Sequence, residues 1–227
     1  MPGVEYSVIS IGTLSRNRLW GEAAAVRTAH ATTTFIREGK RAILVDPSLP
    51  AVALRARFNE RTGMDLTDVT DVFCTTLRPV HRRSVEALLK AKCWAAEKEL
   101  ETYRAYLREL ADSGQRLTGE QQLDVEADLK LLEHFSAAPD KFSEQIHLFP
   151  LNGASPGSAG LLLTPPATTI VIAGDAVVTG EHLLRGQAWQ GCYDAEAALR
   201  SIQDVLDIAD VIVPGHDNLM ISPQRWL

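Results

Sequence analysis

The chain has 227 residues, of which 45% are hydrophobic, so it can bury one sizeable core, and this length is usual for a single domain. Its 29 acidic residues outnumber its 23 basic residues and give a net charge of -6, with the basic residues scattered along the chain. This pattern argues against a nucleic-acid-binding surface, which needs clustered positive charge. No apolar stretch approaches the length that spans a bilayer, so we expect no membrane segment.

The cysteines and the N-terminal residues indicate the compartment. Cys74, Cys93 and Cys192 are odd in number, far apart and without a Cys-x-x-Cys spacing, which argues against a disulfide framework or a zinc ribbon. The first residues lack the basic region and the continuous apolar run of a signal peptide. We therefore expect a soluble protein of the reducing cytoplasm, and we expect Cys74 to be a buried, inert thiol.

The first third of the chain alternates between strand and helix patterns. Strands are predicted at residues 6–14 and, as a hairpin, within residues 34–46. Apolar spacing then predicts a short helix over residues 52–58 and a second buried strand at residues 69–74. A further helix is predicted to begin near His81, because apolar residues follow it at helical spacing.

The middle of the chain, from Cys93 to about Ser136, has the pattern of long amphipathic helices. Thr118 and Gln121 form a predicted capping box, and Asp112-Ser113-Gly114 is the predicted turn of a helical hairpin. We expect this insert, at about residues 93–140, to pack against the body of the domain. The alternative is a lid or a homodimer surface, because its aromatic side chains are costly to leave exposed.

The last third returns to strands and ends in a helix and a strand. Strands are predicted at residues 146–149, 160–163 and 169–173, the last two as a hairpin. Asp194 is the predicted N-cap of the helix that follows, and the last strand is predicted at residues 211–213. Two strand-rich halves that each end in a helix indicate an α+β protein with two sheets covered by helices.

Several short segments follow the predicted strands or lie between them. They are Ala31-Thr32-Thr33-Thr34 leading to Ile43-Leu44-Val45-Asp46-Pro47, the loop at residues 76–81, Asn152-Gly153-Ala154-Ser155-Pro156-Gly157-Ser158, Gly174-Asp175-Ala176 and Pro214-Gly215-His216. Their order and spacing resemble the metallo-β-lactamase fold superfamily over nearly the whole chain. The resemblance implies an αββα four-layer sandwich as one domain over residues 1–227, with metal ions at one edge of the two sheets.

The loop at residues 76–81 departs from the superfamily's pattern, in which the motif His-x-His-x-Asp-His supplies four metal ligands. The same positions here are Thr76, Arg78, Val80 and His81. The resemblance assigns the first ion to the first two of these positions and to Ala154. None of the three residues can ligate a metal as a histidine does, so the resemblance implies that the first metal position is lost.

The second metal position keeps most of its ligands. The resemblance assigns it to Val80, His81 and His216, with Asp175 bridging the two ions, and only Val80 is a loss. Two imidazoles and one carboxylate suit a single divalent ion, zinc above all, with iron and manganese as alternatives. Each of the three side chains also has a structural interpretation, as a hydrogen-bonding residue at the end of a strand or helix.

Two further residues are expected to shape this site. Asp46 follows a buried strand, and we expect its carboxylate to accept hydrogen bonds from loop amides around the site. Arg78 is expected to point into the vacated first position and to pair with Asp175, which would replace a metal ion by a permanent positive charge. The alternative is that Arg78 faces solvent, as most arginines do.

These residues support two hypotheses about function. The favoured one is a non-catalytic or weakly active descendant that carries no metal and keeps the cleft to bind a small-molecule ligand or a partner, with the insert helices supplying the surface. The alternative is a hydrolase with one metal ion on His81, Asp175 and His216, acting on an ester, a thioester or a lactone, which are substrates that the resemblance implies. Metal content separates the two hypotheses, because only the second needs a bound ion.

Overall fold

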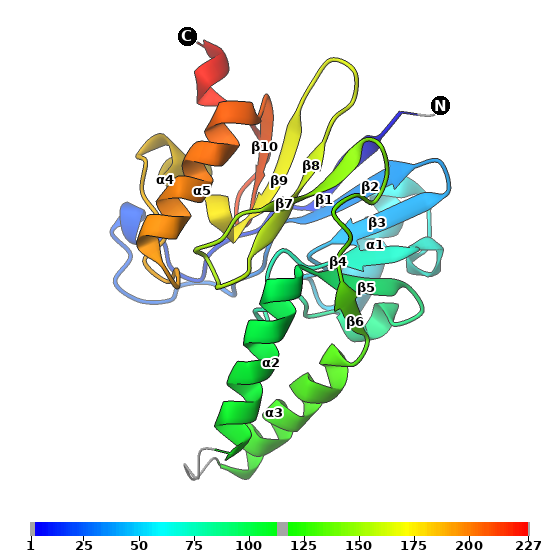
Figure 1. The fold of residues 1–227 in the computed structure, drawn as a ribbon, viewed down its shortest axis with the longest axis vertical. Coiled ribbons are helices and arrows are strands. Elements are labelled where there is room, and N and C mark those ends of the chain that lie inside the picture. Colours follow the sequence, from blue (N-terminus) through cyan, green and yellow to red (C-terminus); the bar gives the residue numbers. More distant parts are fainter. Residues whose placement is uncertain (1–2, 113–117, 227) are drawn as a thin grey trace.

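The computed structural model of the protein describes residues 3–112 and 118–226. Its first sheet has six strands in the order β1-β2-β3-β4-β5-β6 (Figure 1). Neighbouring strands are antiparallel from β1 to β3 and parallel from β3 to β6. The strands are β1 (Glu5–Ser10), β2 (Thr33–Glu38), β3 (Arg41–Val45), β4 (Asp71–Phe73), β5 (Lys92–Ala95) and β6 (Phe135–Ala137).

The second sheet has five strands in the order β11-β10-β9-β8-β7. Only the pair β9 and β10 is parallel, and the other neighbours are antiparallel. The strands are β7 (Ile146–Pro150), β8 (Ala159–Leu163), β9 (Ile170–Gly174), β10 (Val211–Pro214) and β11 (Met220–Ile221). The predicted hairpins at β2–β3 and β8–β9 are confirmed by this pairing.

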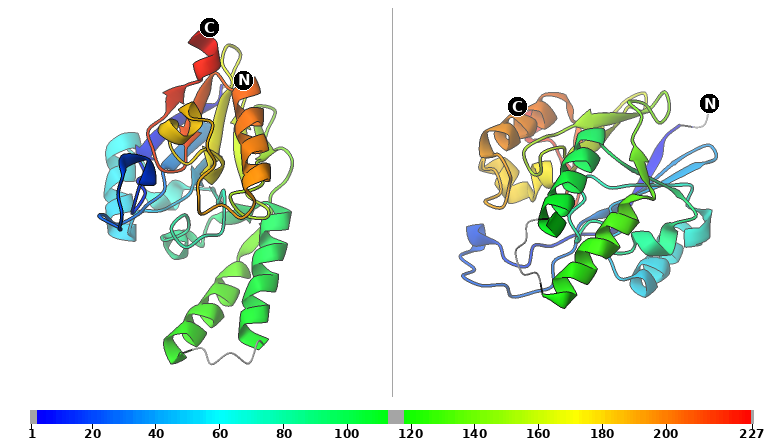
Figure 2. Two further views of the ribbon diagram at one scale, coloured as in Figure 1. Left: turned by 90° about the vertical axis from the view of Figure 1, so that its left-hand side faces the viewer. Right: turned by 60° about the horizontal axis from the view of Figure 1, so that its bottom comes forward.

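Helices cover the outer face of each sheet (Figure 2). The α-helices are α1 (Ala51–Thr62), α2 (Glu97–Asp112), α3 (Gly119–Leu132), α4 (Gly180–Leu184) and α5 (Ala195–Ile208). The 3-10 helices are η1 (Arg18–Trp20), η2 (Leu66–Asp68), η3 (Val85–Leu88), η4 (Asp175–Val177) and η5 (Pro223–Trp226). None of the helices in the described part of the chain is both long and apolar enough to cross a bilayer.

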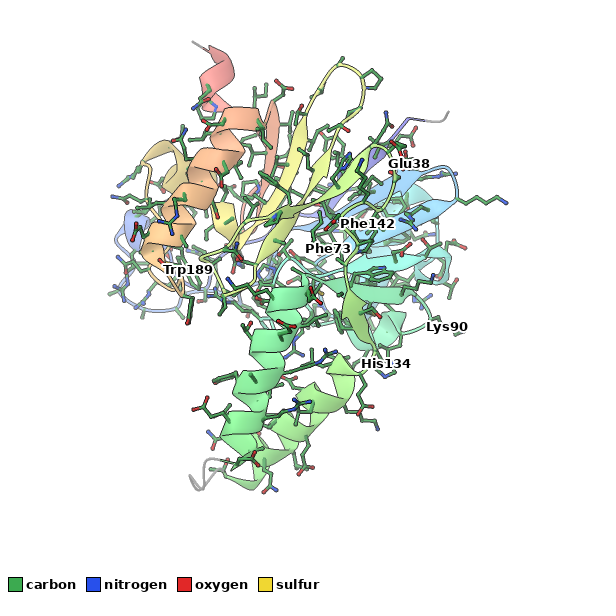
Figure 3. The ribbon with its side chains drawn as sticks, in the orientation of Figure 1. Glu38, Phe73, Lys90, His134, Phe142 and Trp189 are labelled. Carbon is green, nitrogen blue, oxygen red and sulfur yellow. The ribbon has the colours of Figure 1, made fainter. Side chains whose placement is uncertain are left out.

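Separate apolar clusters fill the spaces between the layers. Side chains of both sheets form the cluster between them, where Phe73 meets Phe142 edge to face with ring centroids 6.1 Å apart (Figure 3). On the outer face of the first sheet, Phe58 of α1 packs against Phe35. On the outer face of the second sheet, Val205 of α5 is buried in a third cluster. The four-layer αββα arrangement predicted from the sequence is therefore confirmed.

The helical insert consists of α2 and α3, which run side by side and extend away from the two sheets (Figure 1). Leu100 and Leu132 join the core of the first sheet, whereas Tyr106 and Leu123 are 54% and 66% exposed. The insert therefore packs against the body of the domain only at its near end. The homodimer surface stays a prediction.

The predicted helix caps are correct, whereas the predicted start of the helical insert is not. Thr118 and Gln121 form the predicted capping box, and Asp194 caps α5 as predicted. The predicted hairpin turn lies outside the described residues at Ser113 and Gly114. The start of the helices at Cys93 is wrong, because Lys92–Ala95 is strand β5, parallel to β4.

The helix predicted near His81 is also wrong, because only the short 3-10 helix η3 forms there. Strand β6 has no counterpart in the prediction. Both β5 and β6 are short, and three or four residues are too few for their apolar pattern to distinguish a strand from the start of a helix.

Candidate functional site

The predicted site residues lie where strands of the two sheets end. Asp46 follows β3, Asp175 follows β9, and His216 comes two residues after β10. His81 lies in the loop that follows β4. Since β3 is parallel to β4 and β9 is parallel to β10, their carboxyl ends meet at one edge of the sandwich.

The structure brings His81, Asp175 and His216 together. The Nε2 atoms of both histidines lie 3.1 Å from Oδ1 of Asp175. One ligand atom from each residue lies within 4.8 Å of the others, and all three side chains are buried. The three residues that the sequence singled out therefore form one compact group.

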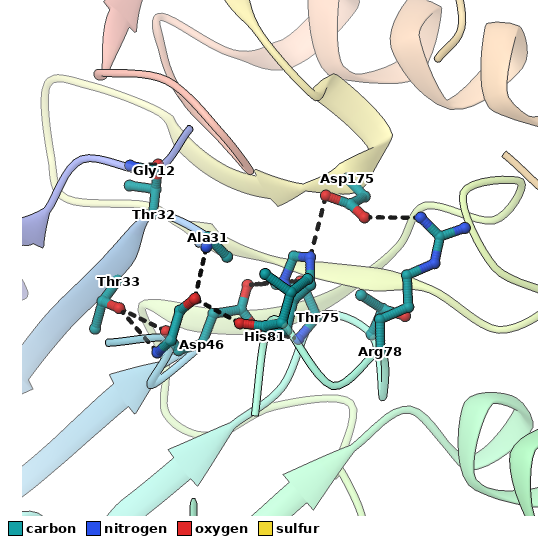
Figure 4. A network of polar contacts seen from close by, with 12 residues as sticks. Gly12, Ala31, Thr32, Thr33, Asp46, Thr75, Arg78, His81 and Asp175 are labelled. Atoms are coloured by element: carbon teal, nitrogen blue, oxygen red, sulfur yellow. Dashed lines mark hydrogen bonds and ion pairs between the residues drawn. The ribbon is translucent and has the colours of Figure 1, made fainter. Parts of the chain in front are cut away.

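Asp46 fixes the orientation of His81. Its Oδ2 lies 3.0 Å from Nδ1 of His81, and its two carboxylate oxygens accept hydrogen bonds from the amide and the hydroxyl of Thr75, at 2.9 and 2.7 Å. Figure 4 shows this chain of contacts. Asp46 is the only non-glycine residue with a positive φ among the described residues, at 49°. The expectation that Asp46 accepts a loop amide is confirmed, and the strained backbone aims its carboxylate at the site.

His216 is oriented by backbone carbonyls instead. Its Nδ1 lies 2.9 Å from the carbonyl oxygen of His30 and 3.2 Å from that of Thr13, so Nδ1 carries a proton and donates it. Nε2 is thereby turned toward Asp175. A Cβ atom on Gly215 would lie 2.7 Å from Oδ1 of Asp175, so only glycine allows this close approach.

The geometry of the three ligand atoms fits one divalent ion. Nε2 of His81 and Oδ1 of Asp175 are buried, lie 3.1 Å apart and have no hydrogen-bond partner outside the group of His81, Asp175 and His216. In a tetrahedral zinc site with bonds of about 2.0 Å, neighbouring ligand atoms are separated by about 3.3 Å. Two imidazole nitrogens and one carboxylate oxygen are also a common donor set for zinc and ferrous iron.

A proton can take the place of such an ion. Burial alone lowers the pKa of His81, but the carboxylates of Asp175 and Asp46 outweigh burial and raise this pKa to about 10. Burial raises the pKa of Asp175, but the imidazoles of His81 and His216 hold it well below its usual range. Without a metal, His81 is therefore an imidazolium between two carboxylates at neutral pH.

Arg78 lies beside the group of His81, Asp175 and His216. Its Nη1 lies 3.1 Å from Oδ2 of Asp175 (Figure 4). Its Nη2 donates to the carbonyl oxygens of Ala154 and Gly191 at 2.5 and 2.8 Å. The guanidinium also lies over the ring of Trp189, 4.7 Å from its centroid. The predicted pairing of Arg78 with Asp175 is confirmed, and the solvent-facing alternative is wrong.

Glu99, near the start of α2, is a site residue that the sequence did not indicate. Its buried carboxylate accepts hydrogen bonds from the hydroxyls of Thr76 and Ser155, at 2.8 and 2.7 Å, and from the amides of Leu77 and Gly157, at 2.9 and 3.2 Å. A Cβ atom on Gly157 would lie 2.1 Å from the backbone nitrogen of Glu99. Glu99 therefore joins the insert to two loops of the site.

The positions that the resemblance assigns to lost metal ligands have other contacts in this structure. Thr76 bonds to Glu99, the carbonyl of Ala154 bonds to Arg78, and the half-buried Val80 has only an apolar side chain to offer. Cys74 is buried, as predicted, and burial raises its pKa well above the usual value, which disfavours the reactive thiolate.

Comparisons with known proteins give matches in structure only. No protein-family model matches the chain, and no curated protein matches it in sequence. Similar solved structures include a Thermotoga maritima protein assigned to the metallo-beta-lactamases, with 15% identity and a TM-score of 0.71 over 96% of this chain and 99% of that one.

Two structures with a bound N-acyl-L-homoserine are also similar. The dizinc quorum-quenching lactonase AidC, in complex with the product N-hexanoyl-L-homoserine, has 14% identity and a TM-score of 0.64 over 90% of this chain and 80% of that one. A mutant of B. thuringiensis AiiA with N-decanoyl-L-homoserine at its active site has 17% identity and a TM-score of 0.61 over 95% of this chain and 93% of that one. These likenesses, together with the two sheets and their helical layers, identify the fold of this chain as that of the metallo-β-lactamase superfamily.

Proposed function

We propose that this protein is a non-hydrolytic member of the fold that binds a small-molecule ligand, with Arg78 in place of the first metal ion. One observation carries the proposal: the guanidinium of Arg78 contacts Asp175, Ala154 and Gly191 at once. Ala154 is a former ligand position for that ion, and Asp175 is the expected bridging ligand. A permanent charge therefore satisfies the groups around the first position.

Two-metal hydrolysis depends on a pair of ions that clamp the attacking and leaving oxygens of the reaction. Thr76, Arg78 and Ala154 supply no metal ligand for the first ion. The positive charge of Arg78 also raises the free energy of a divalent ion placed beside Asp175, and it does so strongly where burial limits screening. Such a clamp is therefore not expected in this protein.

The exposure of the side chains at the site supports the same proposal. The side chains of His81, Asp175 and His216 are only 0%, 2% and 5% exposed, whereas that of Arg78 is 27% exposed. A substrate that approaches this edge of the sandwich meets Arg78 before it meets the three buried residues. Catalysis requires the reacting group to come within about 3–3.5 Å of its partner, so the burial of all three side chains favours a non-hydrolytic role.

The test is a hydrolysis assay with a matched control. We expect the wild-type protein, supplied with zinc, manganese or ferrous iron, to hydrolyse an N-acyl homoserine lactone, an ester and a thioester no faster than the Asp175→Asn variant. That variant removes the one carboxylate that both metal positions share and reports any contaminating activity. Metal-dependent turnover by the wild type that Asp175→Asn abolishes would overturn the proposal.

The convergence of His81, Asp175 and His216 favours a second candidate, a hydrolase with a single ion, for which zinc is the proposed metal. A zinc ion there would act as a Lewis acid and lower the pKa of a bound water to about 7. This candidate predicts one equivalent of metal in protein purified without chelator. It also predicts that His216→Ala removes the metal and the activity together, and activity in metal-free protein would contradict it.

A further inference from the structure

A cavity of about 570 Å³ lies beside the candidate site, between the loop that contains η1 and the segment from α4 to α5. In Figure 1 the blue η1 segment lies next to the segments that contain α4 and α5, and Figure 3 labels Trp189 in the same region. None of His81, Asp175 and His216 lines this cavity. Its volume is within the range of small-molecule sites.

The charge around the cavity is positive. Arg16 and Arg18 line it, and its lining contains no aspartate or glutamate. Arg16 donates to the carbonyl oxygen of Ala23, and within residues 3–112 and 118–226 neither arginine forms an ion pair with a carboxylate. An anion in the cavity would therefore meet two guanidinium groups whose charge is not already balanced.

The acidic residues closest in sequence to the lining do not cancel this charge. Glu22, Glu181 and Glu196 are paired with Arg27, Arg185 and Arg200, which lie outside the lining. Asp194 caps α5 and accepts a hydrogen bond from the amide of Ala197. None of these four carboxylates forms an ion pair with Arg16 or Arg18.

The rest of the lining combines apolar residues with the polar side chains of Ser15, His182, Gln187 and Gln190. Leu14, Leu19 and Leu199 supply aliphatic surface, and Trp189 supplies an aromatic ring. Nδ1 of His182 lies 2.8 Å from the hydroxyl of Thr179, so Nε2 is the ring nitrogen that is left for a ligand. A ligand with one anionic group and an apolar or aromatic body matches this combination.

We propose that this cavity binds a small organic acid, with its carboxylate toward Arg16 and Arg18 and its apolar body against Trp189 and the leucine side chains. The proposal names the ligand class of the non-hydrolytic function and rests on that function. Trp189 also stacks on Arg78, so a ligand that touches its ring acts on the residue that fills the first metal position. Binding would thereby favour the contacts that Arg78 makes with Asp175, Ala154 and Gly191.

The experiment compares an acid with its uncharged amide. 1-Naphthaleneacetate and 1-naphthaleneacetamide have the same aromatic body and differ in charge, and isothermal titration calorimetry measures the affinity of each. We expect the wild-type protein to bind the acid at least about tenfold more tightly than the amide, because two charge-assisted contacts are available to the acid only. No detectable binding of the acid, or equal affinities, would overturn the proposal.

Substitutions in the lining test whether the acid binds in this cavity. The double substitution Arg16→Gln and Arg18→Gln should remove the preference for the acid and leave the affinity for the amide within about twofold, because the apolar contacts remain. Arg61→Gln, at an exposed residue of α1 outside the lining, is the matched control and should keep the preference. A preference that persists in the double variant would contradict the assignment.

The outcome is separable from that of the hydrolysis assay. A failure of the acid to bind removes the ligand assignment and leaves the contacts of Arg78 as they are. Metal-dependent hydrolysis would remove the non-hydrolytic function, whereas the acid preference of Arg16 and Arg18 is measured on metal-free protein.

Discussion

The guanidinium of Arg78 lies 3.1 Å from the carboxylate of Asp175, in a pair that joins the loop after β4 to the end of β9. Asp175 is almost fully buried and also faces His81 and His216. The carboxylate expected to bridge two metal ions thus lies between an arginine on one side and two imidazoles on the other.

Removal of Arg78 should destabilise the fold. Arg78→Ala leaves Oδ2 of Asp175 without its partner, and we expect a loss of about 2–4 kcal/mol in the free energy of unfolding. Arg78→Lys keeps the charge but lacks the planar fork that reaches three acceptors, so its loss should be smaller. Urea unfolding in the presence of a chelator measures both. Arg61→Ala should change stability by less than about 0.5 kcal/mol, and an Arg78→Ala variant as stable as this control would contradict the structural role.

Glu99 should be sensitive even to an isosteric change. Glu99→Gln replaces one acceptor oxygen by an amide donor that faces the hydroxyl and amide groups now bonded to the carboxylate. We expect a loss of about 1–3 kcal/mol, because buried donors lose their acceptor. Glu101→Gln, at an exposed position of the same helix, should have almost no effect in the same unfolding experiment. Equal stability of the two variants would show that Glu99 does not hold the insert to the site.

The stability of metal-free protein should fall as the pH rises from about 6.5 to about 10. The pKa of His81 is raised from 6.5 in the unfolded chain to about 10 in the folded one, so its contribution is complete below pH 6.5 and disappears as the pH passes the folded value. The slope is at most about 1.4 kcal/mol per pH unit. Urea unfolding across this range should show the decline in the wild type and a flatter profile in His81→Gln. A flat wild-type profile would mean that His81 is not held as an imidazolium.

Local patterns predicted the caps and most strands correctly. Thr118, Gln121 and Asp194 act within one helical turn, so their sequence neighbours contain the whole signal. Strand β5 was missed because its strand character depends on pairing with β4, which lies about twenty residues earlier in the chain. Tertiary contact of this kind overrides a short local pattern.

The sequence likewise predicted some residues of the site and missed another. The order of the motifs indicated that His81, Asp175 and His216 lie together, and the substitution at Arg78 indicated its pairing with Asp175. Glu99 is one of 29 acidic residues, and nothing near it in the chain distinguishes it from the exposed glutamates of the same helix. Its role arises from four donors on two remote loops, which only the folded chain brings to it.

The number of zinc ions that the protein binds tests the central claim most directly. Equilibrium dialysis against excess zinc, followed by elemental analysis, counts the ions per chain, and His216→Ala serves as the control for the second position. Because Arg78 lies in the first position, we expect no more than one zinc ion per wild-type chain. We expect His216→Ala to hold no zinc ion at the second position. Two tightly bound zinc ions per wild-type chain, one of them lost in His216→Ala, would contradict the claim that Arg78 replaces the first metal.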